Sequence, residues 1–357
     1  MRIEVDTTRP LREQPGTGHN RWHPGIGPIA RIAPGEELTL ETRDGLDGQL
    51  SPTSTAADLM SARFGLSHPL TGPVHVEGAE PGDLLEVEIL GYEHSDFGIT
   101  AFIPGFGLLA DVFPEPYLVV WELDDGHGRT ASLPGVAIPA EPFAGVLGIS
   151  PSSDGMNEAR RREQELAARG GTVAADDVDD AWPPDAAGGL RTIPPRETGG
   201  NLDVRQLVAG SKLLLPVQVD GALFSAGDLH FAQGDGEVCG SAIEIAGAVT
   251  VRFGLRKQPQ WLPRFPAFET PATGTRPSFA TTGIPIAHDG SNASMDVGLA
   301  ARRALLELVD HLNATRGLTR EAAYALCSVA ADLRISQIVD APNALVSAIL
   351  PLDIFDD

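Results

Sequence analysis

The chain has 357 residues, of which 42% are hydrophobic, so it can bury a sizeable core and is expected to be globular. Its 26 Lys and Arg against 49 Asp and Glu give a formal net charge of −23. This balance argues against nucleic acid or a membrane as a partner, because both need basic surface patches. Two cysteines without a CxxC spacing exclude a disulfide scaffold and favour a reducing, cytoplasmic compartment.

The length predicts two domains or one large all-β unit, at about 100–200 residues per domain. We place a mainly-β body that carries the polar motifs at residues 1–255. An α-containing part over residues 256–357 is expected to pack on it. The first ten residues are charged and contain no apolar run, so we expect no signal peptide. No segment approaches the roughly 20 apolar residues of a membrane span.

Short alternating runs predict strands along the chain. Residues 36–42 and 83–89 alternate polar and apolar side chains, and each run follows a Pro-Gly turn signal. Residues 212–219 and 248–255 are two further strand candidates. The 40 glycines and 29 prolines favour many short strands and turns over long helices.

Helical signals are local. Residues 154–169 contain good helix formers, residues 296–313 repeat apolar side chains at helical spacing, and a short helix is expected over 319–330. Residues 172–189 indicate an exposed loop, and residues 256–276, rich in proline and aromatic side chains, indicate an irregular connection. No phosphate-binding glycine motif follows a strand, which weighs against a nucleotide-binding enzyme.

The first polar segment contains His19 and His23. On a helix this HxxxH spacing would bring both rings to one face and suit a metal. Pro24 and Gly25 follow at once and disfavour a helix, so hydrogen bonding in a loop or contact with a substrate is favoured. We carry His23 forward as a substrate-binding candidate.

Two further segments place acidic residues beside glycines. Residues 43–49 follow a predicted strand, and their aspartates indicate a turn or a source of oxygen ligands; Asp44 is the ligand candidate. At residues 199–203 a Gly-Gly pair allows close approach of the backbone to a ligand. Asn201 and Asp203 then alternate along an extended segment, so both side chains are expected on one side.

Residues 227–237 form the richest segment. Asp228 and His230, at positions i and i+2 of a strand, are expected to point the same way. Asp, His and Glu together match the ligands of a hydrolytic zinc site. A calcium-binding acidic turn or a tight hairpin is the alternative, although calcium prefers oxygen ligands and His230 argues against it.

Nucleophile chemistry has weaker support. No GxSxG motif is present. Cys239 stands among apolar strand residues, where a lone cysteine more often acts as a small buried hydrophobe.

Several motifs resemble signatures of the acetamidase/formamidase family. They occur in order along the chain, at residues 19–24, 71–73, 76–83, 113–117, 194–197, 199–203, 227–237, 334–340 and 342–344. The resemblance implies a mainly-β fold with jelly-roll-like β-sandwich elements and an α/β C-terminal part. It also implies a cytoplasmic homo-oligomer that hydrolyses formamide, acetamide or related short amides.

We therefore hypothesise that a metal-activated water hydrolyses a short aliphatic amide to a carboxylate and ammonia. The divalent ion is expected to be zinc, with calcium as the alternative. The candidate metal ligands are Asp44, Asp203, Asp228 and His230. Glu237 is the candidate general base, Glu244 orients a ligand and Asp235 completes the catalytic candidates. The candidates for contact with the substrate are Asn201, Gln233 and His23, the first two toward the developing oxyanion.

Two alternatives stay open at this point. The scaffold could hydrolyse another small C–N substrate, of ureido or guanidino type. It could also be a catalytically inert homologue in which the acidic loops bind calcium and stabilise an assembly.

Overall fold

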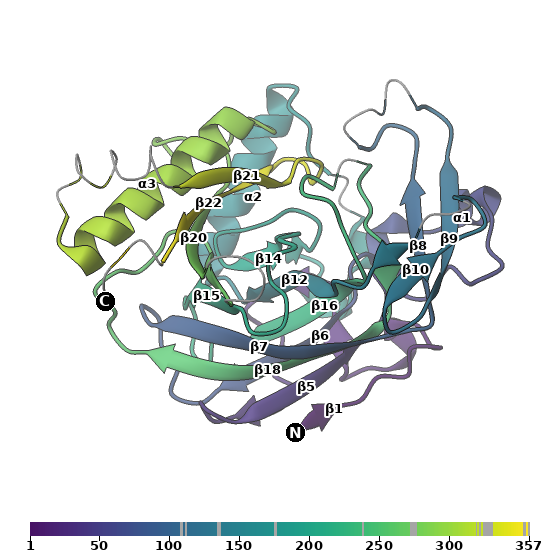
Figure 1. The fold of residues 1–357 in the computed structure, drawn as a ribbon, viewed down its shortest axis with the longest axis horizontal. Coiled ribbons are helices and arrows are strands. Elements are labelled where there is room, and N and C mark those ends of the chain that lie inside the picture. Colours follow the sequence, from purple (N-terminus) through teal and green to yellow (C-terminus); the bar gives the residue numbers. More distant parts are fainter. Residues whose placement is uncertain are drawn as a thin grey trace.

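The computed structural model describes residues 1–107, 110, 113–133, 137–174, 177–237, 239–271, 277–318, 320, 323, 331–352 and 355. Over these residues the chain is mainly β, with most strands in two large sheets (Figure 1). The short helix expected over 319–330 falls almost wholly outside the described residues. No helix in the described part is both long and apolar enough to cross a membrane.

The first large sheet has nine strands among the described residues. In spatial order these are β1 (Arg2–Ile3), β5 (Glu37–Thr42), β18 (Gly247–Arg256), β7 (Leu84–His94), β15 (Lys212–Pro216), β19 (Ala267–Thr270), β20 (Ser278–Gly283), β22 (Leu345–Pro351) and β21 (Asp332–Gln337). All neighbouring pairs are antiparallel except β1 with β5.

The second sheet has eleven described strands. Its main path is β11 (Ile138–Pro139), β10 (His127–Arg129), β9 (Tyr117–Leu123), β8 (Phe97–Phe102), β17 (Glu244–Ile245), β16 (Phe224–His230), β12 (Phe143–Ile149) and β14 (Gly199–Asn201). Beside it, β6 (Leu70–Val76) pairs with β16, and β2 (Gly18–His19) and β4 (Ala30–Ile32) pair with β6. A separate ribbon joins β3 (Arg21–Trp22) to β13 (Leu190–Arg191).

The described helices lie outside the sheets. They are α1 (Ala56–Ser61), α2 (Ser153–Ala168) and α3 (Val297–Arg316), with single 3₁₀ turns at Leu11–Glu13, Phe64–Leu66, Val178–Asp180 and Pro184–Ala186. The Asp296 side chain caps α3 by accepting from the Leu299 amide, and Gly317 ends it in the left-handed region at φ +66°. The apolar face of α3 packs on β20 and β22.

The strands and long helices expected from the sequence are confirmed. Alternation correctly predicts β5 and β7, although β7 continues past residue 89 to His94. The two further strand candidates correspond to β18 and to β15, which ends at Pro216 rather than at residue 219. The core lies between the two sheets, where Phe224 of β16 contacts Phe253 of β18 edge to face, with ring centroids 5.2 Å apart. Burial of both inner faces therefore stabilises the sheets against each other.

The expected exposed loop over residues 172–189 is wrong in its central part. Asp180 and Ala181 are buried. Asn20 holds this segment in place, because its side-chain amide donates to the Asp180 carbonyl and accepts from the Trp182 amide, at 2.9 and 2.7 Å. Hydrogen bonds to a distant segment therefore override a composition that is typical of a solvated loop.

The expected irregular connection over residues 256–276 contains a strand within its described part, residues 256–271. Residues 267–270 form β19, which joins β15 to β20. The first large sheet is consequently continuous across the division that we place at residue 255. That division stays a prediction.

Candidate active site

Six ionisable side chains meet at one face of the eleven-stranded sheet, and we call them the carboxylate cluster. Its members are Asp203, Asp228, His230, Glu237, Glu244 and Asp340. Asp228 and His230 lie on β16, Glu244 opens β17, and Glu237 belongs to the loop between these strands. Asp203 follows β14, and Asp340 comes from the segment between β21 and β22. Five of the six residues are less than a tenth exposed, and Glu244 is half-buried.

Strand pairing brings these residues together. β12 pairs with β14 on one side and with β16 on the other, which sets Asp203 beside Asp228. His230 and Glu244 are direct cross-strand partners. An isolated bridge between Gly236 and Gln337 draws the C-terminal segment against the same loop. The cluster is thus assembled from parts of the chain that lie more than one hundred residues apart.

The histidine stands at the centre of the cluster. His230 Nε2 lies 3.1 Å from Glu244 Oε2 and 3.4 Å from Asp228 Oδ2, and His230 Nδ1 lies 4.0 Å from Asp203 Oδ1. One ligand atom each from Asp203, Asp228 and His230 lie within 4.8 Å of one another. Glu237 forms two further such groups, one with His230 and Glu244 and one with Asp203 and Asp340. This spacing suits ligands around a divalent cation.

Several of the buried polar atoms have no hydrogen-bond partner within the protein. They include both carboxylate oxygens of Asp203 and Nδ1 of His230, whereas Nε2 of His230 and Oε2 of Glu244 face each other as an ion pair. Leaving such groups unpaired is costly, and native proteins rarely do so without a ligand. One imidazole and several carboxylates are a donor set that fits a divalent metal.

Local backbone strain coincides with the cluster. Asp203, Asp228 and Glu237 adopt φ angles of +49°, +56° and +46°, in the left-handed region that non-glycine residues rarely occupy. Strain of this kind persists only where the surroundings over-determine it, and it concentrates at functional sites. Three carboxylates of the cluster are therefore carried by left-handed residues.

Glycine makes room for the side chains of the cluster. A Cβ atom on Gly145 of β12 would lie 2.6 Å from Asp203 Oδ1, 2.7 Å from Asp228 Oδ2 and 2.8 Å from His230 Cε1. On another side, a Cβ atom on Gly45 would lie 2.4 Å from Asp228 Oδ1. Any larger residue at either position would displace the Asp228 carboxylate.

Burial and mutual repulsion disturb the protonation of the carboxyls. Burial, reinforced by neighbouring carboxylates, raises the pKa of Asp203 and of Glu237 well above the usual range and that of Asp340 to about 7. Burial also favours neutral Asp228, but the nearby His68 and His230 outweigh it and lower the pKa of Asp228 to about 2.

In His230 the surroundings favour the charged form of the side chain. Burial favours neutral His230, but Glu244 and Asp228 outweigh it and raise the pKa of the imidazole well above its ordinary value. The cluster therefore concentrates negative charge that protons or a cation must offset.

Most of the predicted site residues lie in or beside the cluster. Asp203, Asp228, His230, Glu237 and Glu244 are its members. Asn201 Nδ2 donates to Asp340 Oδ2 at 2.9 Å, and Gln233 Nε2 donates to the Asp203 carbonyl at 3.1 Å. The expectation that Asp228 and His230 point the same way is confirmed by the contact between them.

Three predicted site residues are not brought into the cluster. Asp235 is exposed, accepts from Gln206 Nε2 and faces Arg334. His23 accepts from the Gly25 amide and lines a cavity of about 370 Å³ whose wall includes no member of the cluster. Asp44 lies behind Gly45, and its two oxygens accept from backbone amides of its own turn.

Sequence reasoning missed Asp340, His68 and Gly145. Asp340 belongs to a motif quoted for the family resemblance, so that motif was the available signal. His68 Nε2 lies 3.9 Å from Asp228 Oδ1. Gly145 stands in an apolar strand, where no sequence signal marks its contact with the cluster. Cys239 is an unpaired thiol whose pKa burial raises, which disfavours a thiolate nucleophile.

Comparisons with known proteins place the chain in a family. The sequence profile of the Acetamidase/Formamidase family matches residues 4–357. An acetamidase of Mycolicibacterium smegmatis is 34% identical, over 91% of this chain and 88% of that protein. A formamidase of Methylophilus methylotrophus is also 34% identical, over 99% of this chain and 93% of that protein.

Solved structures agree with the sequence comparison. An acetamidase from Bacillus halodurans superimposes with a TM-score of 0.75 at 28% identity, covering 95% of this chain and 97% of that chain. A gamma lactamase from Delftia acidovorans superimposes with a TM-score of 0.72 at 32% identity, covering 100% and 94%. The chain therefore belongs to the acetamidase/formamidase family of amide hydrolases.

Proposed function

We propose that the protein hydrolyses a short aliphatic amide, of formamide or acetamide type, to a carboxylate and ammonia. The observation that carries this proposal is the carboxylate cluster. It is a buried histidine among five acids, with unpartnered nitrogen and oxygen atoms, in a chain of an amide-hydrolase family. The cluster offers groups for binding, for proton transfer and for holding a cation at one place.

The donor set supports a divalent ion, with zinc as the first candidate and calcium as the alternative. Asp203, Asp228 and His230 would hold it, because their ligand atoms are mutually close and largely unpartnered. A divalent ion bound there would supply Lewis-acid activation of a water and of the amide carbonyl. Asp44 stays a predicted further ligand, although its oxygens already accept from the amides of Leu46 and Gly48.

Glu237 is proposed as the general base. Its position among the ligand atoms of the cluster suits a group that takes a proton from the attacking water and then gives it up. The proton goes to the amide nitrogen, because ammonia can leave but the amide anion cannot. Glu237 lies within reach of His230 and Glu244, so the transfer takes place inside the cluster.

Glu244 is proposed to orient His230. One carboxylate oxygen, Oε1, is fixed by the Ala242 amide at 2.8 Å and by the Ser241 hydroxyl at 3.1 Å. The other oxygen faces His230 Nε2. A carboxylate held in this way sets the tautomer and the ring orientation of a ligand histidine.

The substrate-binding residues favour contact with the amide nitrogen. Asn201 and Gln233 already use their NH₂ groups within the protein, and Asn201 Oδ1 and Gln233 Oε1 have no partner. These free oxygens are acceptors, so they suit the N–H donors of a primary amide better than a developing oxyanion. The oxyanion role predicted from the sequence is therefore not retained for these two residues.

The test is ammonia release from formamide, acetamide and longer amides, before and after chelation and with zinc restored. We expect turnover of at least one short amide, lost with the chelator and recovered with zinc. Turnover that ignores a strong chelator would refute the metal part of the proposal alone. Absence of ammonia from every amide, with zinc or calcium supplied, would refute the function and favour the inert calcium-binding alternative.

A second candidate substrate is a cyclic amide, because a relative of known structure at 32% identity is named a gamma lactamase. A five-membered lactam belongs in the same assay, read as release of the amino acid. Ureido and guanidino compounds complete the panel. The jelly-roll detail of the sandwich, the α/β C-terminal part, the cytoplasmic location and the homo-oligomer are proposed from the family resemblance.

A further inference from the structure

The carboxylate of Asp228 is held between two glycines. Its Oδ1 faces Gly45 and its Oδ2 faces Gly145, and a Cβ atom at either position would come within 2.4 or 2.7 Å. Gly145 belongs to β12, which pairs with β14 on one side and with β16 on the other, so its place is fixed by strand pairing. Gly45 belongs to the turn at residues 43–48 after β5, where no sheet pairing fixes the backbone. The position of Gly45 must therefore be set by other contacts.

Side chains of the turn itself make the first of these contacts. Asp44 Oδ1 accepts from the Leu46 amide at 2.8 Å, and Asp44 Oδ2 accepts from the Gly48 amide at 3.0 Å. Asp47 adopts a φ of +61°, which closes the turn. These bonds shape the turn but do not attach it to the rest of the protein.

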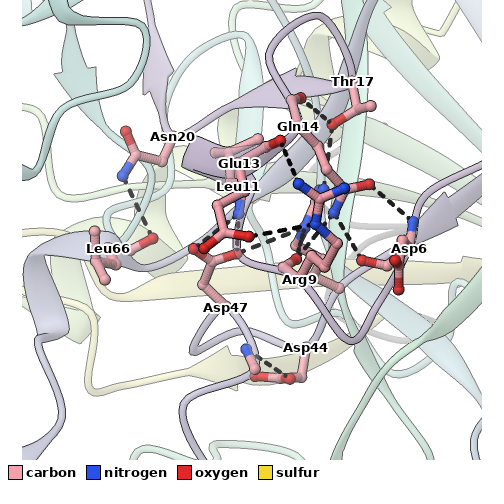
Figure 2. A network of polar contacts seen from close by, with 12 residues as sticks. Asp6, Arg9, Leu11, Glu13, Gln14, Thr17, Asn20, Asp44, Asp47 and Leu66 are labelled. Atoms are coloured by element: carbon pink, nitrogen blue, oxygen red, sulfur yellow. Dashed lines mark hydrogen bonds and ion pairs between the residues drawn. The ribbon is translucent and has the colours of Figure 1, made fainter.

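A buried ion pair attaches the turn to the N-terminal segment. The side chains of Arg43 and Asp47 are 1% and 2% exposed, with Arg43 Nε 3.6 Å from Asp47 Oδ1. Both oxygens of Asp47 accept from the Leu11 amide, at 2.8 and 3.1 Å. Arg43 donates to the Arg9 carbonyl at 3.1 Å and to Thr17 Oγ1 at 3.3 Å. Figure 2 shows Asp47 beside Leu11 and Arg9, with Asp44 in the same turn.

A buried ion pair contributes little net stability, because the loss of hydration offsets the attraction between its members. This pair instead fixes the position of the turn, because four hydrogen bonds link its two side chains to three residues of the N-terminal segment. We propose that Arg43 and Asp47 are positioning residues that hold Gly45 against Asp228 and thereby set the orientation of its carboxylate. This inference rests on the proposed function, in which Asp228 is a ligand of the divalent ion.

The test compares Asp47→Ala and Asp47→Asn with a matched control, Asp83→Ala. Asp83 is also buried, accepts from a turn amide, that of Glu80, and pairs with a cation, Lys257, but it contacts no member of the cluster. For each variant we would measure zinc affinity by competition with a chromogenic chelator, kcat and KM, and the melting temperature.

Asp47→Ala is expected to lower zinc affinity and kcat by about 10- to 100-fold, the usual effect of losing support behind a metal ligand. KM should change much less than kcat. Asp47→Asn keeps an acceptor for the Leu11 amide and should recover part of both losses. Asp83→Ala is expected to lower the melting temperature but to keep the zinc affinity and kcat of the wild type.

Equal zinc affinity and kcat in Asp47→Ala and Asp83→Ala, at similar melting temperatures, would overturn the inference. In the Asp228→Asn background, Asp47→Ala should cause no further loss of zinc affinity, and a fully additive loss would also overturn it. Failure of the wild type to bind zinc or calcium would instead count against the metal part of the proposed function. The kcat of Asp47→Ala relative to Asp83→Ala then decides the inference.

Discussion

Two buried groups of charged residues in this protein follow opposite rules. Beside α2 lies an arginine–glutamate cluster, made of Arg162, Arg191, Arg196, Glu163 and Glu197. There Glu163 pairs with both Arg191 and Arg196, and Arg162 pairs with Glu197 at 2.6 Å. In the carboxylate cluster, five acids surround a single histidine, with His68 the further cation-forming side chain described beside it.

The difference appears in the protonation of the acids. Burial alone would raise the pKa of Glu163, but Arg196 and Arg191 outweigh it and lower that pKa. In the carboxylate cluster, burial and neighbouring acids act together, and the pKa values of Asp203 and Glu237 rise. Glu163 is thus compensated by the fold itself. The charge of the carboxylate cluster must be offset by protons or a bound cation. We therefore assign a structural role to the arginine–glutamate cluster and a chemical role to the carboxylate cluster.

The largest expected effect is the loss of activity when the carboxylate cluster loses a ligand. We expect His230→Ala and Asp228→Asn each to lower kcat/KM by about 10³-fold or more, as for members of one catalytic unit. Melting temperatures should be kept or raised, because each change relieves burial of a charge. Asp235→Asn, on the same segment but exposed, is the control and should keep normal turnover. Wild-type activity in His230→Ala would place the reaction elsewhere.

The next effect tests the other side of the comparison. Glu163→Gln leaves two buried guanidinium groups without their carboxylate and should lower the free energy of unfolding by about 3–5 kcal/mol. Activity per folded molecule should not change. The control is Glu158→Gln, because the ion pair of Glu158 with Arg161 is solvent-exposed and should contribute little to stability. Denaturant titration measures both, and equal losses would remove the distinction between buried and exposed pairs.

A smaller effect tests whether the carboxylate cluster needs the space that Gly145 leaves free. Gly145→Ala would press a methyl group against Asp203, Asp228 and His230, and should lower kcat and zinc affinity by about 10- to 100-fold. Gly91→Ala is the control, because Gly91 also lies in a strand, β7, and has no atom within 4 Å of an added Cβ. Similar kinetics for the two variants, measured with matched melting temperatures, would argue against a tight fit at Gly145.

The smallest effect concerns a half-buried histidine, His311, which stacks on an aromatic ring. His311 stacks on Phe279, with ring centroids 3.8 Å apart, and burial, with help from Arg316 and Arg256, lowers its pKa from 6.5 to about 4. The folded state therefore disfavours protonation. The stability that neutral His311 contributes is fully present above pH 6.5 and is lost as the pH falls toward 4.

The slope expected from this histidine is at most about 1.4 kcal/mol per pH unit. His311→Phe removes the titration and keeps an aromatic ring against Phe279. The free energy of unfolding should fall less between pH 7 and pH 5 in this variant than in the wild type. An identical pH slope in both proteins would show that His311 does not titrate in this window.

Much of the secondary structure and most members of the carboxylate cluster were predictable. Period-2 alternation identified β5 and β7, and the helical spacing of apolar residues identified α3. Asp228 and His230 were paired correctly because side chains two apart on a strand share a face. In each of these cases the deciding interaction is local in the chain.

The rest depended on contacts between distant segments. Asp235 and Glu237 are two residues apart and look equivalent in the sequence, yet one is exposed and the other is buried in the cluster. Their difference arises from the left-handed turn at Glu237 and the bridge from Gly236 to Gln337. Residues 172–189 resembled a solvated loop for the same reason, since the bonds from Asn20 that bury Asp180 span 160 residues or more.

The sequence by itself determined the strand-rich class, the long helices, the family and a segment whose side chains could hold a metal. These follow from periodicity, composition and motifs, which are properties of short stretches of chain. Only the tertiary structure decided that Asp340 and Gly145 join Asp228 and His230, and that a turn tied to the N-terminus faces the same carboxylate. The physical reason is that strand pairing and burial create these contacts, and both depend on segments that lie far apart in the chain.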